Sequence, residues 1–201
     1  MIRLARTTII ASIAAAVAMA APAGAQQYSE GYKFIEAVKK KDGNEVQMML
    51  DKPGTTVVNA RDISTGRTAL HFVVDRRDVT WIRYLGQQGA NPNIADDDGV
   101  TPLMLASRLG FIEGVQALIG VGAQVNVANK AGETPLIFGI LSRNRPLVEV
   151  LLQAGADAER RDNAGRSARD YASDDARMMD LIAEHSRPAG ESEAKVYGPS
   201  F

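Results

Sequence analysis

Residues 96–128 decide the fold, and they read DDDGVTPLMLASRLGFIEGVQALIGVGAQVNVA. Gly99 closes a run of three aspartates, which is typical of a tight turn where glycine supplies a positive φ. Thr101 can then cap a helix through its hydroxyl, and Pro102 suits the first helical position because its missing N–H is not needed there. The stretch therefore predicts a turn followed by a short helix over residues 102–109.

The rest of the same stretch predicts a second helix, over residues 112–121. Its apolar residues recur at three- and four-residue spacing and would share one face: Ile112, Val115, Leu118 and Ile119. Gly110 and Gly122 follow the two helices, and glycine is the usual left-handed residue at a helix end. Residues 96–128 therefore form one unit of a turn and two short helices.

This unit recurs along the chain at a fixed period, set by the evenly spaced Gly66, Gly99, Gly132 and Gly165. A fixed period of about 20–50 residues indicates a stack of similar units. The turn and cap positions that carry it are Gly66, Thr68, His71, Gly99, Thr101, Pro102, Gly132, Thr134, Pro135 and Gly165. We expect an extended surface rather than a single catalytic pocket.

Thr-Pro-Leu after Asp-x-x-Gly, paired short helices and Gly-Ala-x-x-Asn at this period resemble the ankyrin repeat. The resemblance covers about Tyr28 to His185. It implies an all-α ankyrin-repeat solenoid, in which each unit is a pair of antiparallel helices with a β-hairpin-like loop projecting at right angles. It also implies that His71 holds its turn together by hydrogen bonds rather than acting as a base or ligand.

The ends of the chain differ from its middle. Arg169 stands where the resemblance implies a buried leucine, and a terminal repeat needs a polar outer face. The predicted division is a signal peptide (1–25), N-terminal capping helices (26–58), three central repeats within 59–161 (63–95, 96–128 and 129–161), a degenerate C-terminal capping repeat (162–186) and a disordered tail (187–201).

The signal peptide is predicted from Arg3 and Arg6, an apolar run over residues 9–21, and Ala23-Gly24-Ala25, which fits the A-x-A cleavage rule. Cleavage after Ala25 leaves 21 basic and 24 acidic residues. The alanine-rich leader is of bacterial style, so we expect a periplasmic protein without stable membrane association. A secreted protein, or one anchored in the inner membrane by an uncleaved leader, is the alternative.

Composition excludes several classes of site. The chain has no cysteine, two histidines and a formal net charge of −1, so thiolate chemistry is excluded and nucleic acid is not an expected partner. The aspartates of residues 96–98 lack the glutamate that a calcium-binding EF-hand loop needs at its twelfth position. We therefore expect no enzyme activity, cofactor or metal. An enzyme or ligand-binding protein with an unrecognised site is the remaining alternative.

What remains is the surface made by the loops and first helices. The resemblance implies that the following positions line a concave partner-binding face: Ser64, Thr65, Arg67, Asp75, Arg76, Asp97, Asp98, Val100, Arg108, Leu109, Lys130, Ala131, Glu133, Leu141 and Ser142. Val100, Leu109 and Leu141 are apolar at expected exposed positions, which suits an apolar centre with a charged rim. We expect a monomeric, non-catalytic module that binds a protein, and so modulates, inhibits or chaperones a periplasmic enzyme or toxin.

Two further expectations concern single residues. Arg77 and Arg143 stand where Gly110 ends the first helix, and a left-handed non-glycine residue costs roughly 1 kcal/mol. We therefore expect Arg77→Gly and Arg143→Gly each to raise the melting temperature. Trp81 is expected in the core rather than as an exposed anchor.

Overall fold

The computed structural model describes residues 23–185, which contain ten α-helices and one 3-10 helix, η1. In chain order they are α1 (Ala23–Lys40), α2 (Gly43–Leu50), η1 (Val57–Asn59), α3 (Ala69–Asp75), α4 (Val79–Gln87), α5 (Pro102–Arg108), α6 (Ile112–Gly120), α7 (Pro135–Leu141), α8 (Arg145–Gln153), α9 (Ala168–Ala172) and α10 (Ala176–His185). The helices expected over 102–109 and 112–121 are confirmed as α5 and α6.

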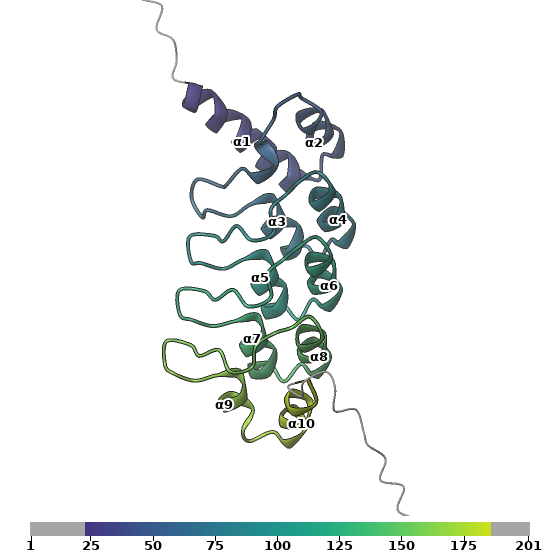
Figure 1. Ribbon diagram of the computed structural model, residues 1–201. Coiled ribbons are helices and arrows are strands. Elements are labelled where there is room, and N and C mark those ends of the chain that lie inside the picture. The colour runs from purple at the N-terminus through teal and green to yellow at the C-terminus, as the bar shows by residue number, and fades with distance from the viewer. Residues whose placement is uncertain (1–22, 186–201) are drawn as a thin grey trace, which may run out of the picture.

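The helices stack as two rows (Figure 1). An inner row holds α3, α5, α7 and α9, an outer row holds α4, α6, α8 and α10, and the loops between repeats project from the side of the inner row. Each inner helix packs on its own outer partner and on the inner helix of the next repeat. The predicted all-α solenoid is confirmed.

Each inner helix begins at the hydroxyl residue of its turn. The Thr101 hydroxyl accepts a hydrogen bond from the Met104 backbone N–H, and the Thr134 hydroxyl accepts one from Ile137, both at 3.3 Å. Pro102 follows Thr101 as the first residue of α5, where its ring fixes a helical φ. Capping at both turns sets the same starting point for the helices, which keeps the repeats in register.

The core runs without interruption through the stack. Leu70, Leu103 and Leu136 hold equivalent positions on successive inner helices and are almost fully buried. Arg169 takes the fourth position, on α9, and pairs with Glu159. Burial of a leucine side chain contributes roughly 2 kcal/mol. Within residues 23–185 no further repeat covers this position on α9, so a charged residue stands there in place of a buried leucine.

The N-terminal cap differs from its expected boundaries. α1 starts at Ala23, so residues 23–25, which include the predicted cleavage site, lie in its first turn. α2 starts at Gly43 because the Asp42 carboxylate accepts a hydrogen bond from the Glu45 N–H at 3.0 Å. Residues 1–22 of the predicted leader (1–25) and the predicted tail (187–201) lie outside the described residues. Within residues 23–185, no helix combines the length and apolarity needed to cross a membrane.

Candidate interaction face

Four loops project beside the inner helices, and we call them fingers: residues 62–67, 96–100, 129–133 and 162–166 (Figure 1). The last three share one turn. The side-chain oxygen of Asp96 accepts hydrogen bonds from the N–H groups of Asp98 and Val100, and the Gly99 N–H donates to the Asp96 carbonyl at 3.0 Å. Asn129 and Asp162 repeat this arrangement. Asp96, the first of the three aspartates of residues 96–98, therefore closes a turn.

Glycine sits at the same point of every finger with a positive φ. The φ angles of Gly66, Gly99, Gly132 and Gly165 are 68°, 79°, 80° and 78°. A side chain at Gly132 would also meet the Asn163 backbone nitrogen at 2.7 Å, closer than real Cβ contacts come. Glycine thus permits the turn at all four positions, and at Gly132 it also permits the close stacking of neighbouring fingers.

The first finger is one residue longer than the others. Its turn is closed by the Gly66 N–H donating to the carbonyl of Asp62, four residues back instead of three. The extra residue is Ile63, whose side chain is 73% exposed. The repeat period hides this insertion because it falls before Gly66 and leaves the glycine spacing unchanged.

Backbone hydrogen bonds join the fingers in two pairs. The Asp97 N–H donates to the Thr65 carbonyl, and the Asn163 N–H donates to the Ala131 carbonyl, both at 3.0 Å. Among residues 23–185, no backbone hydrogen bond joins the second finger to the third. An ion pair of 3.0 Å between Arg61 and Asp97 adds a side-chain link within the first pair.

An asparagine ladder joins successive repeats near the ends of the outer helices. The side-chain oxygens of Asn59, Asn93 and Asn126 accept bonds of 2.7–2.8 Å from the next repeat's backbone N–H groups, and their amide groups donate to the carbonyls of Gly89, Gly122 and Gly155. Sequence reasoning missed this role, although the recurrence of asparagine at nearly the repeat period was a usable signal. The ladder makes the scaffold continuous across all repeats.

His71 has a structural role in the first repeat. Its side chain is fully buried, its Nδ1 accepts a hydrogen bond from the Thr68 N–H at 3.0 Å, and its Nε2 lies 2.9 Å from the Val100 carbonyl, to which it donates. Burial lowers the pKa of His71, so the imidazole is neutral at physiological pH. Both ring nitrogens are engaged within a fully buried site, so the imidazole holds the turn in place and is not positioned to act as a base.

Two residues expected on the face do not lie there. The prediction that Val100 is exposed is wrong: it is 5% exposed, and its backbone carbonyl is held against His71 of the preceding repeat. Arg76 is also largely buried. Its Nη1 donates to the Val38 carbonyl at 2.5 Å and its guanidinium lies 4.9 Å from the Trp81 ring centroid, so it caps the last turn of α1. Trp81 itself is partly buried against the core.

The first finger uses its polar groups internally. The hydroxyls of Ser64 and Thr65 both donate to one carboxylate oxygen of Asp62, and Lys39 lies 3.0 Å from the other. The Ser64 hydrogen bond is the main cause that holds the pKa of Asp62 well below its usual range. Arg67 pairs with Asp75 at 2.7 Å. Charge on this part of the face is therefore largely neutralised.

The middle of the face is different. Leu109 and Leu141, at the ends of α5 and α7, are 36% and 52% exposed. Arg108 is exposed beside them, with its guanidinium 5.7 Å from the ring centroid of Phe138. The remaining expected positions Asp97, Asp98, Lys130, Ala131 and Ser142 are exposed, and Glu133 is half-buried and accepts a hydrogen bond from Asn129.

A stripe of large side chains runs along the inner helices, and lysine or arginine side chains lie over its aromatic rings. Phe72, Leu105, Phe138 and Tyr171 hold equivalent positions in successive repeats and are half-buried. Cations lie over the three rings, with Arg166 at 4.2 Å from the Tyr171 centroid and Lys39 at 4.6 Å from that of Phe72. The sequence analysis missed the stripe, whose regular spacing is visible in the chain.

No metal centre is built on the described face. Within residues 23–185, no group of three or more histidine, aspartate or glutamate side chains comes close enough to hold an ion. The fingers and inner helices form a rigid, ridged surface with different side chains at equivalent positions. Such a surface is suited to recognising a binding partner.

Comparison with known proteins identifies the repeats. A family model described as "Ankyrin repeats (3 copies)" matches residues 34–129 and 82–162, which together make up well over half of the chain. The chain is also similar to Oxysterol-binding protein homolog 1 of Saccharomyces cerevisiae, with 31% identity over 80 residues, or 38% of this chain. The matched segment is 7% of that relative's length, so the similarity concerns a small part of it.

Proposed function

The chain belongs to the ankyrin-repeat family, whose repeats form protein–protein interaction modules, and we propose that it binds a protein partner through the face made by its fingers and inner helices. One observation carries this proposal: equivalent positions on one rigid frame hold unlike side chains. Asp75, Arg108 and Leu141 occupy the same point of successive inner helices. A frame repeated faithfully with a varied surface is suited to recognising one target.

The ankyrin-repeat family is generally non-catalytic, and we propose that this chain does no chemistry of its own. Its effect is then exerted through the partner, as modulation, inhibition or chaperoning of an enzyme or toxin. The leader pattern of residues 1–25 supports a periplasmic site of action.

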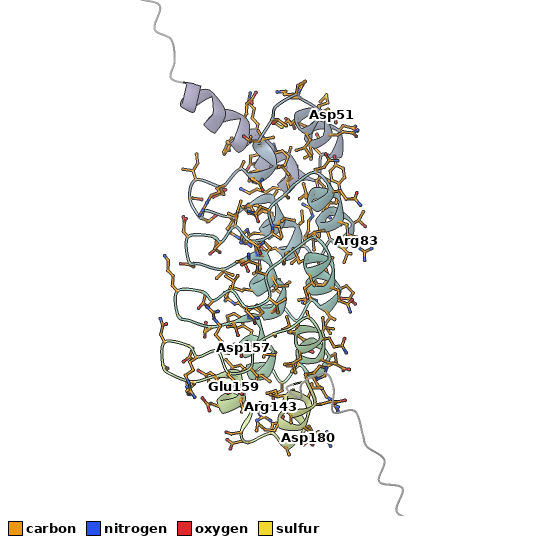
Figure 2. The ribbon with its side chains drawn as sticks, in the orientation of Figure 1. Asp51, Arg83, Arg143, Asp157, Glu159 and Asp180 are labelled. Atoms are coloured by element: carbon orange, nitrogen blue, oxygen red, sulfur yellow. The ribbon has the colours of Figure 1, made fainter. Side chains whose placement is uncertain are left out.

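The binding proposal is tested by cross-linking and pull-down from a periplasmic extract of the source bacterium, with tagged full-length protein. Two variants probe the face: Asp98→Lys/Lys130→Glu on the finger tips, and Leu109→Ser/Leu141→Ser on the inner helices. Arg83→Glu, on the outer row (Figure 2), is the control. A specific partner that both face variants lose and the control keeps supports the proposal. A partner kept by both face variants contradicts it.

The location is tested separately by mass spectrometry of the protein recovered from the periplasmic and the membrane fractions. A mature N-terminus at Gln26 supports export with cleavage after Ala25. An intact Met1 in the membrane fraction would instead support the alternative of a scaffold tethered by its leader.

A further inference from the structure

The most distinctive part of the interaction face is a strip of arginines and leucines at the ends of α5 and α7. We define the arginine–leucine strip as Arg77, Arg108, Leu109, Leu141 and Arg143. All five side chains are exposed, and the two leucines are among the most exposed large apolar residues of the described chain. Both leucines keep a substantial part of their surface open to solvent at the helix ends.

Contacts between repeats hold the strip together. The Arg77 guanidinium donates a 2.6 Å hydrogen bond to the Leu109 carbonyl, which fixes it against the end of α5. Arg108 in turn lies over Phe138 of α7. Leu141 is three residues beyond Phe138 and so lies on the same side of α7. Arg77, Arg108, Leu109 and Leu141 are therefore linked across three repeats, and Arg143 follows Leu141 in the turn after α7.

The strip carries positive charge without compensation. Residues 101–112 and 134–148 contain Arg108, Arg143 and Arg145 but neither aspartate nor glutamate. Within the described part of the chain, none of the three strip arginines lies within ion-pair distance of a carboxylate. The flanking repeats differ, because Asp75 and Asp78 pair with arginines in the first and the turn after α9 carries an exposed Asp174 in the last.

We propose that the arginine–leucine strip binds an acidic, leucine-containing segment of a protein partner in extended form. The proposal rests on the proposed function and adds the chemistry of the partner. Carboxylates of the segment pair with the three arginines, and its aliphatic side chains cover Leu109 and Leu141. Inner helices lie roughly 10 Å apart, so three repeats span about 20 Å, the length of about six residues of extended chain.

The test uses fluorescence anisotropy with the full-length protein and a fluorescein-labelled peptide of repeated Glu-Glu-Leu, about twelve residues long. We expect saturable binding that weakens as NaCl is raised, and none to a matched Lys-Lys-Leu peptide. Replacing leucine by serine in the acidic peptide should weaken binding several-fold. Failure of the acidic peptide to bind more tightly than the basic one overturns the proposal.

Paired charge reversals locate the binding site. Arg108→Glu/Arg143→Glu is expected to weaken peptide binding at least tenfold. Arg83→Glu/Arg177→Glu on the outer helices changes the net charge equally and should leave the Kd within about twofold. Equal weakening by both pairs would mean general attraction and would overturn the proposal. Arg108→Gln/Arg143→Gln, checked by thermal denaturation, provides a milder variant if the reversal unfolds the chain.

Two measurements separate this inference from the proposed function. If the captured partner is lost by Asp98→Lys/Lys130→Glu but kept by Arg108→Glu/Arg143→Glu, the protein-binding function stands and the strip proposal fails. Sedimentation of the protein alone tests a second copy as occupant. A dimer that the strip reversal abolishes would overturn the partner proposal in favour of self-association.

Discussion

His71 of one repeat and Val100 of the next are joined by a hydrogen bond of 2.9 Å from the imidazole Nε2 to the backbone carbonyl. His71 is fully buried, and its Nδ1 accepts a hydrogen bond from the Thr68 N–H. A second proton on the ring would have to sit on Nδ1, where it would replace this hydrogen bond. Met104 and Ile137 hold the equivalent position in the following repeats. The imidazole link is therefore specific to the junction of the first two repeats.

The first prediction concerns the pH dependence of stability. Burial lowers the pKa of His71 in the folded chain below its usual value of about 6.5. Below about pH 6.5 the unfolded chain therefore binds a proton at His71 that the folded chain does not bind. The contribution of His71 to the free energy of unfolding is thus fully present above about pH 6.5. It is lost as the pH falls from there towards the lowered pKa, by up to about 1.4 kcal/mol per pH unit. Thermal denaturation at pH 7.5 and pH 5.5 should show the loss. The loss should persist in His185→Gln and largely vanish in His71→Gln.

The second prediction separates two left-handed arginines, with φ of 56° at Arg77 and 52° at Arg143. Arg143→Gly is expected to raise stability by up to about 1 kcal/mol, a shift of roughly 2–4 °C, because glycine removes the strain. Arg77→Gly gains less, since it loses the hydrogen bond to Leu109 and the contact with Phe111. Differential scanning calorimetry gives both values. Arg143→Ala, which keeps the Cβ, should show no gain.

The third prediction concerns the carboxylate at the base of the first finger. Asp62→Asn is expected to cost roughly 1–2 kcal/mol at pH 7, because the charged group accepts from Ser64 and Thr65 and pairs with Lys39. The pKa of Asp62 is lowered, so its contribution is present above about pH 4 and is lost as the pH falls further. In denaturant titrations, the difference in free energy of unfolding between the two proteins should therefore be smaller at pH 3 than at pH 7.

The fourth prediction concerns the asparagine ladder. Asn126→Ala removes a bond donated to Gly155 and one accepted from Asp157, and should cost roughly 1–2 kcal/mol. In a solenoid the loss is felt mainly by neighbouring repeats. Hydrogen exchange should therefore speed up in α8, α9 and α10 more than in α3. Uniform acceleration along the chain would show that the stack unfolds as a single unit.

Much of the fold could be predicted from the sequence because the signals are local. Gly99 fixes its turn, and Thr101 and Pro102 fix the start of α5, through backbone geometry that neighbouring residues alone determine. Val100 and Arg76 could not be placed in this way, since their burial depends on packing against the next finger and against α1.

The site was harder to predict because it depends on contacts between segments that are distant in the sequence. The inserted Ile63 was not predicted either, because an insertion just before Gly66 leaves the spacing of the glycines unchanged. The charge state of the face also depends on pairs that are distant in sequence, such as Lys39 with Asp62 and Arg61 with Asp97. Only the structure distinguishes these charges, which form ion pairs, from Arg108 and Arg143, which form none with the described carboxylates.

The pairing of the fingers has a mechanical consequence. Between the second and third fingers the described backbone offers no hydrogen bond, so the Asn93 rung of the ladder and the packing of α5 on α7 hold the repeats together at that junction. We therefore expect bending to be least resisted there, with two stiffer halves on either side. Leu109 and Leu141 lie on opposite sides of this junction, so a small change in curvature alters their separation while leaving both halves unchanged.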